Sequence, residues 1–306
     1  MATIYLFYIL KGKIETVNFN SLLIPFQINI ELLILVFLLM PLNWGIEMMK
    51  WKRLTNKFQS LSYFQAIQSI LSGIFIGLLT PNRIGEVGGR LLFIRKENRP
   101  KALYVNSVCS LSQTMATLFF GMIAIIFFRD EIASNIKIQK ELLLIVSMIA
   151  VMMFLYIYFR SNSLKLVYNF VGQKFAKDHT LNEFDITKLE RLNVLLFSIL
   201  RYVVFGLQFF LLLFILIPSA GFWQLFMAVC LIYLSATVVP TAWLSSLPVR
   251  TSFAFLIIEM IGFDGFFGLI SSVLLWIINL FIPAVFGIIS LKGLNFKKVL
   301  NKKNAL

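Results

Sequence analysis

Apolar segments of bilayer-spanning length alternate with short polar segments along the chain. Each of the long segments is close to the roughly 20 residues that a helix needs to cross the hydrocarbon core of a membrane. They cover residues 21–49, 102–128, 141–159, 193–217 and 266–291. The pattern predicts an all-α, polytopic membrane protein with about 6–8 transmembrane helices. Residues 1–306 are expected to form a single integral membrane domain.

Two shorter apolar segments stop abruptly at prolines, which cannot continue a helix because they lack the backbone donor. Segment 63–79 ends at Thr80-Pro81, and segment 222–239 ends at Pro240. Basic residues flank 63–79 on both sides, so a full crossing would place one basic loop outside, against the positive-inside rule. A re-entrant or broken helix removes this conflict. Paired breaks in two halves of a chain also predict an inverted repeat with a transport site between the breaks.

Composition indicates that lipid is the solvent of the chain. Hydrophobic residues make up 59% of the sequence and charged residues only 14%, against about 25% charged residues in soluble domains. The formal net charge is +14, which in a soluble protein would suggest nucleic acid as a partner. Here the cations lie between apolar segments, where the positive-inside rule and anionic headgroups explain them. We therefore expect membrane lipids as partners and no nucleic acid.

The distribution of charge predicts the orientation. Residues 160–191 mix lysines with acids and are expected to form a cytoplasmic amphipathic loop, whereas 129–140 are expected on the outer side. The tail, 292–306, contains lysines without an acid and is predicted to be cytoplasmic. These features predict a multi-pass protein of the bacterial plasma (inner) membrane. The sequence leaves open a homo-oligomer or a partner enzyme.

Residues suited to metal or nucleophilic chemistry are scarce. The two cysteines, Cys109 and Cys230, lie inside apolar segments, and His179 is the one histidine, in the polar loop. Neither a His-based metal site nor a Ser-His-Asp set can be assembled from them. We therefore expect no metal, no cofactor and no catalytic residues.

The loop Thr80-Pro-Asn-Arg-Ile-Gly-Glu-Val-Gly-Gly-Arg90 is the strongest local feature. Pro81 ends the preceding helix, Asn82 follows it, and Gly85 permits a close backbone approach. Arg83, Glu86 and Arg90 then place two guanidinium groups around a carboxylate. Since arginine binds phosphate bidentately, the loop could hold an anionic lipid headgroup. The alternative is a plain cytoplasmic turn. A phosphate-binding P-loop is excluded, because the Gly-Lys-Ser/Thr ending is missing.

Polar residues also interrupt the end of the first long segment. Asn43, Glu47 and Lys50 are spaced by four and three positions, so they fall on one helical face. They could support the same headgroup site, or simply form an ion pair at a helix end. Arg201, inside segment 193–217, is interpreted as a side chain that reaches the membrane interface. Gln113 is interpreted as a polar contact between helices.

Three of these segments resemble the membrane domain of lysylphosphatidylglycerol synthases and their flippase-like relatives. The resemblance rests on the Thr80-to-Arg90 loop, and more loosely on the sequence from Asn43 to Trp51. The second break, Pro240 to Arg250, resembles a proline- and glycine-rich loop of the family that ends in a Gly-Val-Arg-Glu-like sequence. Arg250 matches the arginine of that sequence. This chain departs from the pattern there, because Leu247-Pro248 replaces glycine and Thr251 stands in place of a glutamate. Glu259 could substitute for that carboxylate or be structural.

The resemblance implies a site and a function. It implies headgroup binding by Arg83, Glu86, Arg90 and Arg250. In the family, aminoacyl transfer resides in a separate soluble domain, for which this chain shows no counterpart after Leu300. We therefore expect no enzyme activity, but a flippase-like transporter of an anionic phospholipid or a polyprenyl-phosphate-linked lipid. The alternatives are a membrane-embedded lipid-modifying enzyme, with Glu47 and Glu86 as the best acidic pair, and a scaffold for a partner enzyme.

Overall fold

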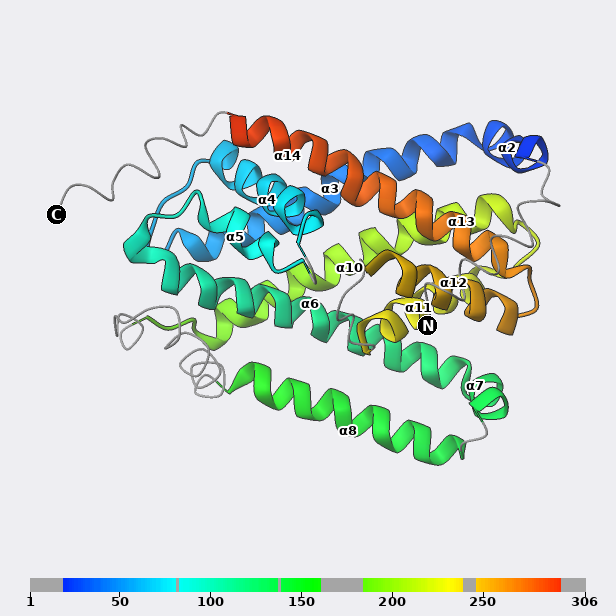
Figure 1. Ribbon diagram of the computed structural model, residues 1–306. Coiled ribbons are helices and arrows are strands. Elements are labelled where there is room, and N and C mark those ends of the chain that lie inside the picture. Colours follow the sequence, from blue (N-terminus) through cyan, green and yellow to red (C-terminus); the bar gives the residue numbers. More distant parts are fainter. Residues whose placement is uncertain (1–18, 81–82, 137–138, 161–183, 239–245, 293–306) are drawn as a thin grey trace.

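The computed structural model describes residues 19–80, 83–136, 139–160, 184–238 and 246–292, and these residues are helical with short connections (Figure 1). The predicted all-α class is confirmed for this part of the chain. Five helical stretches are long and apolar enough to cross a membrane: Ile30–Thr55, Lys96–Phe127, Glu141–Phe159, Lys188–Leu216 and Gly265–Leu291. The chain thus has the helices of a multi-pass membrane protein.

The elements follow one another in a regular order. In chain order they are α2 (Phe19–Ile28), α3 (Ile30–Thr55), α4 (Tyr63–Leu78), α5 (Gly85–Leu91), η2 (Lys96–Asn98), α6 (Arg99–Phe127), α7 (Arg129–Ile136), α8 (Lys140–Phe159), α10 (Lys188–Leu216), α11 (Phe222–Val238), α12 (Ser246–Met260), α13 (Gly265–Trp276), the π-helical turn η3 (Ile277–Phe281) and α14 (Ile282–Lys292).

Helices α4 and α5 form a hairpin whose two ends meet. Ser62 caps the start of α4 with a capping box. The hairpin is tight because glycines face each other: a Cβ on Gly89 would lie 2.6 Å from the Cα of Gly73. At the open end, the Gln59 side chain donates to the Phe93 carbonyl at 2.9 Å. The chain therefore leaves the hairpin next to where it entered, between the end of α3 and the start of α6.

Helices α11 and α12 repeat this arrangement between α10 and α13. The ends of this second hairpin also meet, since the Gln224 side chain near the start of α11 donates to the Ile261 carbonyl after α12 at 3.3 Å. In Figure 1, α4 and α5 extend inward from one end of the bundle, and α11 and α12 from the other end. The order of long helix, hairpin and long helix thus occurs twice.

Helix α10 lies at the centre of the bundle. It runs antiparallel to α3, as the bonds from Gln208 to the Val36 carbonyl (2.8 Å) and from Lys50 to Ser198 (3.1 Å) show. It runs parallel to α6, where Ser112 and Ser198 lie 2.7 Å apart. Of the most apolar part of α10, 61% is buried, the largest share among the five candidate spans.

The outer faces of the bundle are apolar. Only 11% of the apolar part of α8 is buried, and its exposed side chains include Leu142, Ile149 and Met152. In water such a surface would be costly, at about 25 cal/mol per Å² of apolar area. An apolar solvent removes this cost, which agrees with the membrane interpretation of the sequence.

Several boundaries differ from the sequence-based expectation. The first apolar segment is divided at Asn29, between α2 and α3, and not at Pro25 or Pro41, which lie inside helices. Helix α12 begins at Ser246, so Pro248 lies in its first turn, where a proline is tolerated because no intrahelical donor is needed there. Arg250 is therefore helical and does not belong to a loop.

Some predicted features lie outside the described residues. They are Pro81, Asn82, Pro240, His179, most of the loop 160–191 and all but the first residue of the tail 292–306.

Candidate functional site

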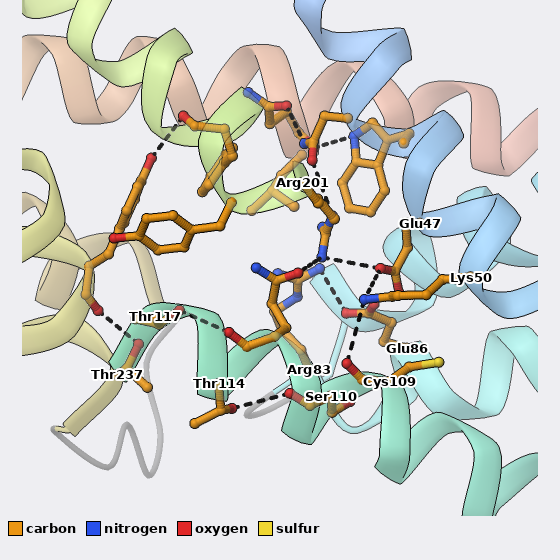
Figure 2. A pocket seen from close by; sticks show the side chains of 18 of the residues that line it. Glu47, Lys50, Arg83, Glu86, Cys109, Ser110, Thr114, Thr117, Arg201 and Thr237 are labelled. Carbon is orange, nitrogen blue, oxygen red and sulfur yellow. Dashed lines mark hydrogen bonds and ion pairs between the residues drawn. The ribbon is translucent and has the colours of Figure 1, made fainter. Parts of the chain in front are cut away.

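A polar cavity of about 410 Å³ lies where the tips of the two hairpins approach α3, α6 and α10 (Figure 2). Its lining residues come from both halves of the chain. They include members of the two clusters of buried apolar side chains that form the core, Tyr202 and Tyr233 in one and Trp44 and Cys109 in the other. The lining residues are Asn43, Trp44, Glu47, Lys50, Arg83, Glu86, Arg90, Cys109, Ser110, Gln113, Thr114, Thr117, Arg201, Tyr202, Phe205, Tyr233, Ala236, Thr237, Arg250, Asn279 and Leu280.

Glu47 is the buried acidic centre of this site. Its carboxylate lies 2.9 Å from Lys50 Nζ, 3.0 Å from Arg90 Nη1 and 3.3 Å from Arg201 Nη1. Lys50 is on the same helix, whereas the two arginines come from α5 and α10. One carboxylate therefore holds three cations from three elements.

Glu86 holds a second group of cations at the tip of the first hairpin. It pairs with Arg83 at 2.8 Å and with Arg90 at 2.7 Å. Arg90 thus bridges the two carboxylates, and its guanidinium also lies over the Trp51 ring, 5.6 Å from the centroid. The structure brings together the Arg83, Glu86 and Arg90 of the loop and the Glu47 and Lys50 of the helix face.

The backbone of the first hairpin presents these side chains to the cavity. Arg83 has a φ of 56°, which is uncommon for a residue other than glycine and directs the chain sharply at the tip. Thr80 Oγ1 accepts a hydrogen bond from the Gly85 backbone nitrogen at 2.8 Å. A Cβ on Gly85 would lie 2.6 Å from both Thr80 Oγ1 and the Ile76 carbonyl oxygen. Gly85 is thus required for the close return of the chain.

Arg201, interpreted from the sequence as a side chain that reaches the membrane interface, lines the cavity. Its Nε donates to Asn43 Oδ1 at 3.1 Å and its Nη1 to Gln113 Oε1 at 3.3 Å. Its guanidinium also lies over the Trp44 ring, at 5.0 Å. The available signal was its position eight residues inside an apolar segment, since an ionisable residue within a span is functional by default.

Asn279 is a site residue that the sequence analysis did not identify. It accepts a hydrogen bond from Asn43 Nδ2 at 3.0 Å, and its carbonyl accepts one from Trp44 Nε1 at 3.1 Å. It lies in the π-helical turn η3. Such single π turns widen a helix and are frequent at functional sites.

Behind the cavity, Lys50 continues the polar contacts into the core. It donates to Ser198 at 3.1 Å and is 1% exposed. Ser198 in turn contacts Ser112 at 2.7 Å. These contacts connect α3, α10 and α6, so the charged site and the helix packing depend on each other.

Arg250 brings the second hairpin to the same cavity. Its Nε donates to Ser272 Oγ and its Nη2 to the Ser272 carbonyl, both at 3.2 Å. Thr251, in the position where the resemblance implies a glutamate, is buried and donates to its own helix at Leu247. Glu259 is exposed and does not line the cavity, so it does not take the place of that carboxylate.

The site has an excess of basic side chains, and two of its arginine donors have no acceptor. Its described lining carries five basic and two acidic side chains. The Nε atoms of Arg83 and Arg90 are buried and have no hydrogen-bond acceptor. Among the described residues there is no group of three or more His, Cys, Asp or Glu side chains that could hold a metal ion. The arrangement can therefore bind a phosphate or carboxylate by charge-assisted hydrogen bonds.

Comparisons of the chain with protein-family models, with curated proteins and with solved structures found no match.

Proposed function

We propose that this chain is a flippase-like membrane transporter that holds the headgroup of an anionic lipid in the cavity while the acyl chains stay in the bilayer. The observation that carries the proposal is the convergence of five basic side chains from four helices and one hairpin tip on one cavity within an apolar bundle. Charges at membrane depth are costly and are retained where they serve a substrate pathway.

The topology supports an alternating-access mechanism. The contacts Gln59–Phe93 and Gln224–Ile261 bring the two ends of each hairpin together, so each hairpin enters the bilayer and returns to the same face. The described residues contain five candidate spans, fewer than the 6–8 transmembrane helices expected from the sequence, and two shorter apolar helices, Tyr63–Leu78 and Phe222–Val238, that we assign to the hairpins. The hairpins extend from opposite ends of the bundle (Figure 1), which supports the proposed inverted repeat of the two halves. Transporters built this way place the substrate between the broken helices.

The charges at one end of the bundle favour a cytoplasmic location for that end. Lys57 at the end of α3 contacts Glu190 at the start of α10 at 2.8 Å, and Arg95, Lys96 and Lys101 lie in the segment that follows the first hairpin. Under the positive-inside rule, this charge supports a cytoplasmic location for this end of the bundle, in line with the bacterial inner membrane expected from the sequence. A ligand would then reach Arg83 and its neighbours from the cytoplasm, the side from which the first hairpin enters.

The resemblance to lysylphosphatidylglycerol synthase membrane domains supports the same function, since its implied residues Arg83, Glu86, Arg90 and Arg250 all line the cavity. A lipid-modifying enzyme is less well supported. Its best acid pair, Glu47 and Glu86, is engaged by cations at 2.7–3.3 Å. Carboxylates held in this way are poor general bases.

Lipid movement in reconstituted vesicles tests this proposal. The purified protein is placed in vesicles that contain a fluorescent anionic phospholipid, and the rate at which the lipid changes leaflets is measured. Arg83→Gln removes a charge-assisted contact worth about 1.5–3 kcal/mol, so we expect the rate to fall by roughly 10-fold or more. Arg95→Gln, an exposed arginine outside the cavity lining, is the matched control and should retain the full rate. An unchanged rate for Arg83→Gln would contradict the proposal.

A further inference from the structure

We propose that the cavity is selective for a phosphate that carries at least two negative charges, a phosphomonoester or a diphosphate, over a phosphodiester. This inference rests on the proposed function and names the chemical class of its headgroup. It follows from the charge of the lining and from the way these charges are distributed.

The described lining has an excess of three positive charges. The basic residues are Lys50, Arg83, Arg90, Arg201 and Arg250, and the acidic residues are Glu47 and Glu86. The short segments 81–82 and 239–245, at the tips of the hairpins, contain no ionisable side chain in their sequences, Pro-Asn and Val-Pro-Thr-Ala-Trp-Leu-Ser. They do not change this excess.

Both acidic side chains of the described lining lie on one side of the cavity. Both lie with the first half of the chain, where Glu47 contacts Lys50, Arg90 and Arg201 and Glu86 contacts Arg83 and Arg90. Arg250, from the second hairpin, donates only to the neutral Ser272 among the bonds of the described residues. An anion that enters between the hairpins would therefore face Arg250 on one side and Arg83 with Arg90 on the other.

Two arginine side chains of the lining each have one donor without an acceptor. The Nε groups of Arg83 and Arg90 are buried without an acceptor, while the Nη groups of Arg90 donate to Glu47 and Glu86. Each unsatisfied buried donor costs about 1–3 kcal/mol. A terminal phosphate has three oxygens that are free to accept, whereas a phosphodiester has two, because the second ester bond uses one of them.

Charge balance then separates the ligand classes. A phosphodiester carries one negative charge and would leave two of the three excess charges in place. A phosphomonoester dianion leaves one, and a diphosphate with three charges leaves none. Because like charges in one site repel each other, a ligand that offsets more of the excess binds better, so the monoester and the diphosphate are favoured.

Competition between two lipids with identical acyl chains tests this inference. The full-length protein in nanodiscs is titrated at pH 8 with dioleoyl phosphatidic acid, a monoester, and with dioleoyl phosphatidylglycerol, a diester. We expect at least about 10-fold tighter binding of phosphatidic acid, equivalent to 1.4 kcal/mol. The preference should shrink below about pH 6, because the second proton of a phosphomonoester binds near there and removes one charge.

The groups that face the ligand are accounted for in this pH test. The charged ones are the five cations and two carboxylates named above, and Cys109, Tyr202 and Tyr233 are the other titratable side chains of the lining. Phosphatidylglycerol, whose charge does not change in this range, therefore serves as the internal control for changes in the protein.

A pair of variants at one position separates charge from structure. Arg250→Gln removes the positive charge of the second hairpin, so the preference for phosphatidic acid should fall several-fold. Arg250→Lys keeps the charge and should keep most of the preference. If both variants lose it equally, Arg250 acts through its packing on Ser272 and the charge argument fails.

The remaining outcomes distinguish this inference from the proposed function. Equal binding of the two lipids, both above neutral phosphatidylcholine, would overturn the substrate class but leave an anionic-lipid site. Binding of neither lipid above phosphatidylcholine would overturn both. Displacement of phosphatidic acid by inorganic pyrophosphate at equal concentration would support the phosphate class, and it would assign the site to a soluble phosphate and not to a lipid headgroup.

Discussion

Glu47 is a single carboxylate that contacts three cations and is 4% exposed. Each of these cations comes from a different part of the chain, with Lys50 on α3, Arg90 on α5 and Arg201 on α10. Removing one partner of a buried ion pair is costly because it leaves the other charge uncompensated. Glu47 should therefore stabilise the fold as well as position the arginines of the cavity.

The substitution Glu47→Gln is expected to lower the free energy of unfolding by roughly 3–5 kcal/mol, the cost of breaking a buried pair from one side. Glutamine keeps the size of the side chain, so the change reports on charge. Unfolding of the purified protein in detergent measures it. Glu31→Gln, at an exposed position of the same helix, should be close to neutral. Equal stability of the two variants would show that Glu47 does not hold the three cations.

The residues of the site were only partly predictable. Arg83, Glu86 and Arg90 could be identified because a local motif, a proline break followed by glycines and arginines, contains all three. Arg201 could not be placed, since helical periodicity does not show which side of a buried helix faces a cavity. Asn279 gave no signal, because its partners Asn43 and Trp44 lie more than 230 positions away in the sequence.

At the scale of the elements, the two hairpins decide where the charges lie. The first is held together by the glycine contacts of α4 and α5, so that Arg83 and Glu86 at its tip reach the cavity. The end of its first helix was predictable from Pro81. The re-entrant character, inferred from the basic residues on both flanks, stays a prediction. The division at Asn29 was not predictable, because the apolar pattern continues across it and neither proline nor glycine marks it.

Gly89 and its neighbour Gly88 give a matched test of the hairpin. A Cβ on Gly89 would lie 2.6 Å from the Gly73 Cα and the Ser72 carbonyl oxygen, whereas a Cβ on Gly88 meets nothing within 4 Å. Gly89→Ala should therefore destabilise the protein by roughly 1–3 kcal/mol, as overpacking does. Gly88→Ala should be neutral or slightly stabilising, because alanine favours helix. Thermal unfolding of both variants in detergent tests this prediction. An equal shift of the unfolding temperature in the two variants would contradict the close packing of α4 on α5.

At the scale of the whole molecule, the cavity forms between two halves of similar order. The sequence predicted helices, breaks and the basic flanks from local patterns. It could not predict that α10 would lie at the centre, or that Arg250 would face the same space as Arg83. These arrangements depend on contacts between residues far apart in the chain, such as Gln208 with Val36, which no local pattern encodes.

The central claim is that two hairpins enter the bilayer from opposite faces and bring Arg83, Glu86 and Arg250 to one cavity. Labelling of single cysteines with a membrane-impermeant maleimide, in intact cells and in inverted vesicles, tests it most directly. The exposed positions are Ser60 and Glu97, which flank the first hairpin, and Ser219 and Asp264, which flank the second. Cys109 and Cys230 are buried and should react little.

We predict that Ser60→Cys and Glu97→Cys are labelled from the same side of the membrane, the cytoplasmic one, because the loops that carry them are joined by the Gln59–Phe93 hydrogen bond. Ser219→Cys and Asp264→Cys should both be labelled from the other side. Labelling of Ser60→Cys and Glu97→Cys from opposite sides would show that α4 and α5 cross the membrane. The arginines of the loop would then no longer lie at its centre, and the lipid site between the hairpins would be wrong.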